Sequence, residues 1–293
     1  MEKIKLAAVI VTYNPEIDRL KDVINSIVNQ VDFIIIVDNG SKNINDIKEI
    51  CSIKSNIEII ENDINYGIGK ALNIGIEKLK NKYDWILTLD QDSVILVNIK
   101  DVIDEITKIY NKEVIGLIFL NIIDENKKTK YEEFRNTFII APIISGSIIN
   151  SKIFLLGITY REEFFMDYID FDLEYNIKRD KFKIIKTNYK GQDHQLGKQI
   201  KTIVGKNINY EPEWRIYLMA RNLSKLLLEK RVGLIFFFKQ FLLWYVSYVI
   251  VKPFKFKKIY NYLYLNIIGI KDAIKNNMGV SENLKRLMTQ NEL

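Results

Sequence analysis

Apolar runs alternate with helical patterns over about the first hundred residues of this 293-residue chain. The strand-like runs occupy 6–13, 33–37, 57–61 and 85–89. Apolar residues at helical spacing follow the first and third runs, over 17–28 and 68–80. The first run is nearly all apolar and the second is apolar throughout, which is typical of strands covered on both faces. The alternation therefore predicts a parallel, doubly wound α/β sheet.

Two aspartates stand at the end of the fourth run, in the segment Leu89-Asp90-Gln91-Asp92-Ser93. Residues two apart on a strand point to the same side, and open α/β sheets bind ligands at the carboxyl ends of strands. Two carboxylates on one side suit Mg²⁺ or Mn²⁺ carrying a diphosphate. An Asp-rich turn that only ends the strand is the alternative.

Composition and charge exclude several classes of protein. Cys51 is the only cysteine and His194 the only histidine, so neither an internal disulfide nor an ordinary zinc site can form. The net charge is +6 and the pI about 9.0, but the basic residues form no arginine-rich patch typical of nucleic-acid binding. A diphosphate or an anionic lipid surface fits this charge better. The N-terminus lacks the layout of a signal peptide, which predicts a cytoplasmic protein.

Two nucleotide-binding motifs are incomplete or absent. Gly67-Ile68-Gly69 begins like a dinucleotide fingerprint, but Leu72 stands where Gly or Ala is needed, and the segment does not follow the first strand. No Walker-type loop is present. Nicotinamide and P-loop chemistry are therefore disfavoured. A nucleotidyltransferase would carry a glycine-rich basic loop after the first strand, where this chain has Tyr13-Asn14-Pro15.

Several motifs in register resemble family-2 glycosyltransferases of the GT-A fold. They are Val-Thr-Tyr-Asn at 11–14, Val-Asp-Asn-Gly-Ser at 37–41, Asn-Tyr-Gly at 65–67 and Leu-Asp-Gln-Asp-Ser at 89–93. The Asp-Gln-Asp-Ser form is similar to that of bacterial rhamnosyltransferases in this family. Later segments agree with this resemblance, at 145–147, 165–172, 194–197 and 217–222. The resemblance covers about residues 4 to 230 and keeps the family order.

The resemblance implies a domain organisation. A GT-A domain, a Rossmann-like and mostly parallel sheet, would occupy residues 1–210. Its nucleotide-sugar half would span about 1–110 and its acceptor half about 111–210. Residues 211–293 would form a helical, aromatic-rich C-terminal extension.

The resemblance also implies a donor site for a nucleotide-diphosphate sugar. Its residues would be Tyr13 against the pyrimidine base, Asp38 accepting a hydrogen bond from the base ring, Asn65, Gly67, Asp90 toward the ribose and metal, and Arg221 on the diphosphate. The Mg²⁺ or Mn²⁺ ligands would be Asp92, Asp90 and His194. Four of these residues have a structural alternative: core packing for Tyr13, a helix or turn cap for Asp38, a surface or packing role for His194 and a solvated helix charge for Arg221.

The segment 165–172 would supply the catalytic base, which the family pattern assigns to Asp170, with Asp167 as the alternative. The implied reaction is a metal-dependent, inverting transfer of L-rhamnose from dTDP-rhamnose to a lipid-linked glycan in surface polysaccharide assembly. A UDP-hexose donor is the alternative within this class. A non-catalytic partner in a polysaccharide-assembly complex is a weaker alternative, because it should lack an intact metal pair and base.

Residues 232–251 form an apolar, aromatic-rich stretch about long enough to span a bilayer. Lys239 and Gln240 in its middle oppose a true span. Basic residues flank the stretch: Lys230, Arg231, Lys252, Lys255, Lys257 and Lys258. We therefore expect helices that lie peripherally on the inner face of the cell membrane. A buried helix pair or an oligomer contact is the alternative.

Overall fold

The structure, a computed structural model, describes residues 4–52, 54–125, 127–134, 144–194, 199–201, 207–209, 212–246 and 256–290. The chain divides into two compact units, and each is described by itself. The first comprises residues 1–161 and 173–195, and the second comprises 162–172 and 196–293.

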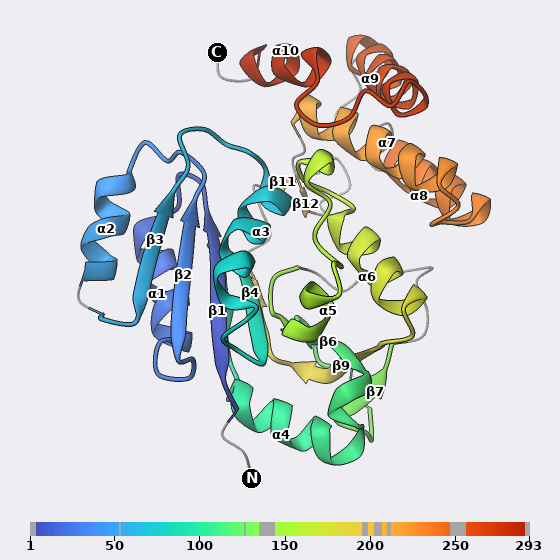
Figure 1. The fold of residues 1–293 in the computed structure, drawn as a ribbon. Helices are drawn as coiled ribbons and strands as arrows, with labels where there is room; N and C mark the ends of the chain where they lie inside the picture. The colour runs from blue at the N-terminus through green and yellow to red at the C-terminus, as the bar shows by residue number, and fades with distance from the viewer. Residues whose placement is uncertain are drawn as a thin grey trace. The chain divides into compact units, whose positions relative to one another are not determined.

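Strands of the first unit form a mixed, mostly parallel sheet. They are β1 (Leu6–Thr12), β2 (Phe33–Asp38), β3 (Ile57–Glu61), β4 (Trp85–Asp90), β6 (Ile115–Asn121), β7 (Tyr131–Glu133), β8 (Ser147–Asn150) and β9 (Lys183–Lys190). Their order in the sheet is β3-β2-β1-β4-β8-β6-β9-β7 (Figure 1). The neighbours from β3 to β4 pair in parallel, as do β6 and β9, whereas β8 and β7 run antiparallel to their neighbours. The predicted α/β fold class is confirmed.

Helices cover both faces of this sheet. The helices and the 3₁₀ turn of the first unit are α1 (Ile17–Ile27), α2 (Ile44–Ser52), α3 (Ile68–Leu79), α4 (Ile99–Ile109), η1 (Lys112–Val114), α5 (Ser151–Leu155) and most of α6 (Ile169–Arg179). Buried residues of α1, α2 and α4 share one core with Leu6, Ala8 and Ile10 of β1. Those of α3, α5 and α6 share the other core with Ala7 and Val9. Successive residues of β1 from Leu6 to Val11 thus enter opposite cores, which explains why this part of the strand is apolar.

The strand order reverses at β1, because the chain passes from β1 to β2 and β3 on one side and returns to β4 on the other. Thr12 is level with Asp38 in the parallel register, and Val11 is level with Asp90. The carboxyl ends of these three strands therefore meet at one place. Open α/β sheets bind ligands at such a topological switch point.

The motif segment after β4 is more structured than the sequence predicts. β4 extends one residue past the predicted strand, to Asp90. A short strand, β5 (Ser93–Ile95), then pairs antiparallel with β10 (Gln192–His194). Ser93 lies opposite His194 in this ribbon, which brings the late histidine to the aspartate motif.

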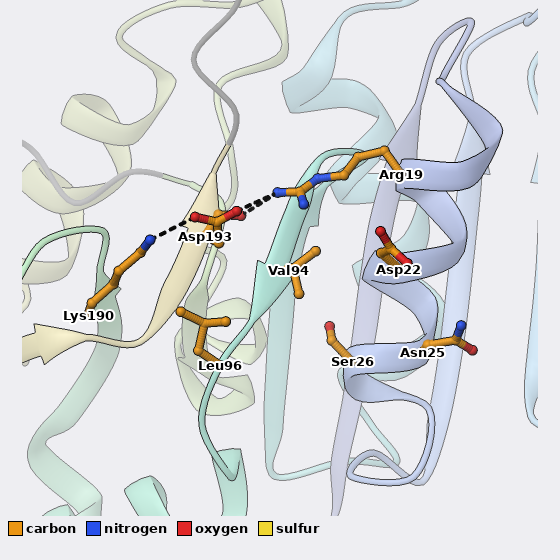
Figure 2. A pocket seen from close by; sticks show the side chains of 8 residues that line it. All are labelled: Arg19, Asp22, Asn25, Ser26, Val94, Leu96, Lys190 and Asp193. Atoms are coloured by element: carbon orange, nitrogen blue, oxygen red, sulfur yellow. Dashed lines mark hydrogen bonds and ion pairs between the residues drawn. The ribbon is translucent and has the colours of Figure 1, made fainter.

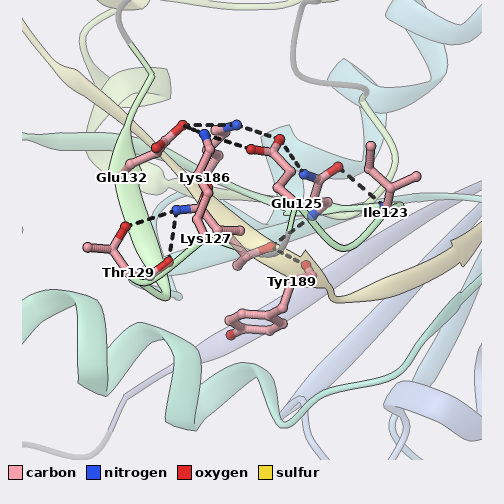
Figure 3. A network of polar contacts seen from close by, with 10 residues as sticks. Ile123, Glu125, Lys127, Thr129, Glu132, Lys186 and Tyr189 are labelled. Atoms are coloured by element: carbon pink, nitrogen blue, oxygen red, sulfur yellow. Dashed lines mark hydrogen bonds and ion pairs between the residues drawn. The ribbon is translucent and has the colours of Figure 1, made fainter.

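A polar network stabilises the far edge of the sheet, where β9 and β7 pair (Figure 3). Lys186 on β9 lies 2.6 Å from Glu125 and 3.0 Å from Glu132. Lys127 lies 2.8 Å from each of the same two carboxylates. These lysines, Lys127 first, lower the pKa of Glu125 to about 2. Lys186 is nearly buried, and the opposite charges of Glu125 and Glu132 offset the free-energy cost of burying its ammonium group.

The second unit is largely helical. Its elements are the turn η2 (Glu162–Phe164), the first residues of α6, the pair β11 (Gln199–Lys201) and β12 (Asn207–Asn209), and the helices α7 (Glu213–Leu228), α8 (Leu234–Val246), α9 (Phe256–Ile274) and α10 (Glu282–Gln290). Its core includes Tyr217, Leu265 and Leu284 from α7, α9 and α10. Gly269 permits close packing of α9 on α7, because a Cβ there would lie 2.7 Å from the carbonyl oxygen of Tyr217.

The predicted C-terminal apolar stretch is helical over α8. On this helix Phe236 is buried and its ring centroid lies 5.4 Å from that of Phe171. Other apolar side chains of α8 are exposed: Leu234, Ile235, Phe238 and Leu242. Residues 247–255, including Lys252 and Lys255, lie outside the described residues, as do the side chains of Lys257 and Lys258. None of the described helices combines the length and apolar character needed to cross a membrane.

Candidate active site

Three potential metal ligands converge beside the switch point. Asp90 is the last residue of β4, Asp92 precedes β5, and His194 ends β10. One ligand atom from each lies within 4.8 Å of the others. His194 lies about a hundred positions after the two aspartates in sequence. The structure nevertheless brings all three predicted metal ligands together in the first unit.

His194 is held between a serine and a carboxylate. Its Nδ1 lies 2.7 Å from Ser93 Oγ and 3.3 Å from Asp92 Oδ1. The close contact with the Asp92 carboxylate raises the pKa of His194, and the negative charge of Asp90 acts in the same direction. The site therefore attracts positive charge, either a proton on the imidazole or a cation.

The donor set fits a divalent cation. Asp92 Oδ1 is buried and accepts no hydrogen bond of ordinary geometry from the described residues. A buried carboxylate oxygen left in this way is costly unless another ligand satisfies it. Two carboxylates and one imidazole match Mn²⁺, and the carboxylates match Mg²⁺. The residues present therefore fit the metal predicted from the sequence.

Tyr13 lies at the carboxyl end of β1 with 40% of its surface exposed. Its predicted alternative as a core residue is therefore wrong. Gln91, between the two aspartates, bonds to the Tyr13 backbone in both directions. Gln91 Oε1 accepts from Tyr13 N at 2.8 Å, and Nε2 donates to Tyr13 O at 3.4 Å. An exposed aromatic ring is thus fixed next to the metal-ligand cluster.

Asp38 is buried and organises the turn after β2. Its carboxylate accepts from the hydroxyls of Thr12 and Ser41 and from the backbone N–H groups of Gly40 and Ser41. A carboxylate offers about four lone-pair sites, and these donors match that number. Ser41 Oγ also accepts from Asn14 N at 2.8 Å, which ties this turn to the end of β1. The contacts therefore support the turn-cap alternative for Asp38, and its contact with a nucleobase stays a prediction.

Asn65 and Gly67 form the turn that starts α3. Asn65 Oδ1 accepts from Gly67 N at 2.9 Å. Gly67 has a φ of 86°, which favours glycine, and its carbonyl accepts from Asn39 Nδ2 at 3.2 Å. The backbone at the start of α3 is thus joined to the turn after β2, beside the switch point.

The candidate bases belong to the second unit, in a segment of unusual backbone. Phe165, Asp167 and Tyr168 have φ values of 65°, 56° and 64°, in the left-handed region. Asp167 accepts three hydrogen bonds from Arg215, at 2.9–3.2 Å. Asp170 is in the first turn of α6, and its Oδ1 accepts from Phe171 N at 2.9 Å. Asp167 is thus held by a cation, whereas Asp170 stands at a helix start.

Arg221 and Asn222 of α7 hold this segment through its carbonyl groups. Asn222 Nδ2 donates to the carbonyls of Phe164, Met166 and Asp167, at 2.7–3.0 Å. Arg221 is fully buried and donates to the carbonyls of Glu163, Phe164 and Gly279. The predicted alternative, that Arg221 is a solvated charge on the surface of a helix, is therefore wrong. Its contact with a diphosphate stays a prediction, and the observed contacts support a role in positioning the 163–167 segment.

Sequence reasoning missed some residues that organise the site. Gln91 and Ser93 stand inside the quoted motif, but nothing in their types shows that they would bond Tyr13 and His194. Asn222 stands in a quoted motif without a predicted role. Each of these polar residues stands next to a predicted site residue in sequence, which could have drawn attention to it. Only the fold identifies the group to which it bonds.

The sequence of this chain is similar to those of known proteins. Residues 7–171 match the family described as "Glycosyl transferase family 2". The chain is 26% identical over 292 residues to "dTDP-rhamnosyl transferase RfbF" of Shigella flexneri, covering 93% of this chain and 96% of that protein.

Solved structures share the fold. The S. aureus TarS 1–349 structure in complex with UDP-GlcNAc has a TM-score of 0.61 at 14% identity, covering 97% of this chain and 84% of that chain. A longer TarS structure has a TM-score of 0.57 at 15% identity, and this chain covers 50% of its length. The mannosyltransferase PcManGT from Pyrobaculum calidifontis, in complex with GDP-Man and Mn²⁺, has a TM-score of 0.57 at 13% identity, covering 94% and 74% of the two chains.

Proposed function

This chain belongs to glycosyl transferase family 2, and we propose that it transfers L-rhamnose from dTDP-rhamnose to a glycan acceptor with inversion at the anomeric carbon. The observation that carries the proposal is the convergence of Asp90, Asp92 and His194 at the switch point. The choice of dTDP-rhamnose is supported by the relative RfbF, which matches nearly the whole chain.

The donor would lie along the carboxyl ends of β1, β2 and β4. The exposed ring of Tyr13 offers a flat face for a pyrimidine, and Gln91 accepts a hydrogen bond from the backbone N–H of Tyr13. The turns at Asp38 and at Asn65–Gly67 would shape the nucleoside side of this site. Asp90 and Asp92 would lie at the diphosphate, where a cation is needed to offset the repulsion between the carboxylates and the diphosphate.

Asp90, Asp92 and His194 would hold Mg²⁺ or Mn²⁺. When bound, this cation neutralises charge on the leaving diphosphate. Ser93 supports the arrangement by fixing the imidazole of His194 through its hydroxyl. PcManGT, a fold relative, was solved with Mn²⁺.

The acceptor hydroxyl requires a base, and we assign this role to Asp170. Its carboxylate would take the proton while the hydroxyl oxygen forms a bond to C1 of the sugar. The C1–O bond to the diphosphate breaks at the same time, and dTDP leaves with the bonding electron pair. One displacement of this kind inverts C1. The family pattern supports Asp170, and Asp167, which accepts hydrogen bonds from Arg215, is the alternative base.

A lipid-linked acceptor would place the enzyme in the cytoplasm, peripherally on the inner face of the cell membrane. The exposed apolar side chains of α8 support this, since Leu234, Ile235 and Phe238 lie near the basic residues Lys230 and Lys239. Apolar anchoring together with basic contacts is typical of reversible binding to anionic lipid.

A donor screen tests the function. Thermal stabilisation and slow donor hydrolysis are measured with dTDP-rhamnose, UDP-glucose, UDP-GlcNAc and GDP-mannose, each with Mn²⁺ and with EDTA. We expect dTDP-rhamnose to give the largest effect, and only with the metal. A preference for a UDP-hexose would overturn the donor assignment, and equal hydrolysis in EDTA would overturn the metal assignment.

A further inference from the structure

Arg19, on the first helix of the chain, bonds to the backbone at the candidate metal ligand Asp92 and at Asp193, the residue before the candidate ligand His194. Its Nε donates to the carbonyl oxygen of Asp92 at 2.8 Å. Its Nη2 donates to the carbonyl oxygen of Asp193, the neighbour of His194, at 2.8 Å, and to Asp193 Oδ2 at 3.1 Å. The side chain is 15% exposed. One guanidinium thus joins the backbones that carry Asp92 and His194.

The ribbon formed by β5 and β10 needs such support. Each strand is three residues long, and the register Ser93↔His194 alone places the imidazole opposite the aspartate motif. An isolated two-stranded ribbon is at best marginally stable in water. A guanidinium presents several N–H donors in a rigid plane, so it can hold two carbonyl groups at a fixed separation, whereas a lysine ammonium is a flexible point charge.

We propose that Arg19 is a positioning residue that holds Asp92 and His194 at the separation a divalent cation requires. This proposal rests on the metal-dependent function proposed above. Removal of the guanidinium would free the backbone at Asp92 and Asp193, and the ligand atoms would sample wider separations. The packing of α1 does not depend on these bonds, because the helix is anchored by its buried apolar residues Leu20, Val23, Ile24 and Ile27.

The position of Arg19 also makes the proposal testable by chemical rescue. Arg19 borders an open pocket of about 500 Å³ between α1 and the ribbon (Figure 2). The pocket is lined by Arg19, Asp22, Asn25, Ser26, Val94, Leu96, Lys190 and Asp193. Truncation of Arg19 would extend this pocket to the two carbonyl oxygens. A guanidinium ion from solvent could then occupy the place of the lost side chain.

The first measurement is Mn²⁺ binding, followed by the electron paramagnetic resonance signal of free Mn²⁺. We expect Arg19→Ala to weaken Mn²⁺ affinity by about 10- to 100-fold, the usual effect of losing a residue that orients metal ligands. Arg19→Lys should recover only part of the loss. Lys21→Ala is the matched control, because Lys21 is an exposed cation on the same helix. Asp193→Asn keeps the carbonyl contact and should have a small effect.

Guanidinium chloride at low millimolar concentration should restore Mn²⁺ affinity to Arg19→Ala and leave the wild type unchanged. Equal Mn²⁺ affinity in Arg19→Ala and the wild type would overturn the proposal. So would a loss that guanidinium does not reverse in a variant whose melting temperature is normal.

The second measurement needs no metal. Hydrogen exchange of the backbone amides at 92–95 and 192–194 should be faster in Arg19→Ala and return toward wild type with guanidinium. Unchanged exchange would contradict the positioning role itself. A wild-type protein that binds no Mn²⁺ would instead overturn the proposed metal function and the metal part of this proposal, and the exchange data would still decide whether Arg19 holds the ribbon.

Discussion

The side chain of Gln91 pairs with the backbone of Tyr13, accepting from its N–H at 2.8 Å and donating to its carbonyl at 3.4 Å. This pair joins the residue between the two aspartates to the exposed ring at the end of β1. The metal-ligand segment and the candidate nucleobase platform are therefore one connected structure.

Gln91→Ala should weaken binding of dTDP by about fivefold to tenfold, since a hydrogen bond contributes about 1 kcal/mol. The reason is that Tyr13 loses its support, while Asp90 and Asp92 remain. Calorimetric titration with dTDP measures the effect, and Mn²⁺ binding by the same variant is the control. Unaltered dTDP affinity in Gln91→Ala would separate Tyr13 from the donor site.

Asp92→Ala should abolish turnover and the metal-dependent part of donor binding, because Asp92 Oδ1 is the buried oxygen without a hydrogen-bond donor among the described residues. Activity and Mn²⁺ affinity are measured together. Asp101→Ala, a change to an exposed carboxylate on α4, serves as the control. Near-normal turnover of Asp92→Ala in the presence of a chelator would rule out the metal assignment.

Asp170→Asn should lower kcat by about 10²- to 10⁴-fold with donor affinity largely kept, because the amide preserves shape but cannot accept the acceptor's proton. Asp167→Asn should instead lower the melting temperature, and Arg215→Met should do the same, since both break one ion pair. If Asp167→Asn is inactive with a normal melting temperature while Asp170→Asn works, the base is Asp167.

The network at Glu125 predicts acid sensitivity. The pKa of Glu125 is lowered to about 2 from an unfolded value near 4.5. Its contribution to the free energy of unfolding is therefore fully present above pH of about 5 and lost as pH falls toward 2. Glu125→Gln should flatten this part of the stability–pH curve in urea unfolding. A curve identical to wild type between pH 5 and 2 would contradict the lowered pKa.

Flotation on liposomes tests the membrane surface. Wild type should float with anionic vesicles and detach in high salt, whereas the combined change Ile235→Ser and Phe238→Ser should reduce flotation without affecting donor hydrolysis. Ile274→Ser, at an equally exposed apolar position on α9, is the matched control. Replacing Lys252, Lys255, Lys257 and Lys258 with Gln should weaken binding through charge alone.

Flotation that resists both salt and carbonate would indicate a spanning segment. Absence of flotation with every vesicle would favour the buried-helix or oligomer alternative for residues 232–251.

Patterns local in sequence were reliable. The apolar run at 6–13 predicted a strand covered on both faces, and the residues of β1 from Leu6 to Val11 enter two cores alternately. The helix predicted at 68–80 lies at 68–79, and the strand at 57–61 was predicted without error. The spacing of Asp90 and Asp92 indicated a shared function, the resemblance assigned His194 to the same site, and the structure brings the three residues together.

The role of a residue that depends on burial or on distant partners could not be predicted from local sequence patterns. Arg221 was expected to be either solvated or at a diphosphate, but its side chain is buried among backbone carbonyls that lie far from it in sequence. Asp38 was expected at the nucleobase or as a turn cap, and its oxygens bond to its own turn and to Thr12. Residue type reports what a side chain can bond, and only the packed chain decides which partner is within reach.

The sequence by itself determined the layered α/β sheet and the position of two aspartates at the end of a strand, because hydrophobic periodicity and motif spacing are local along the chain. The tertiary structure alone decided how the site is held together. Arg19 lies seventy-three residues from Asp92, and no periodicity or motif relates the two. Their contact exists because α1 packs beside the β5–β10 ribbon once the sheet has formed, so it is a product of the fold and not of any segment.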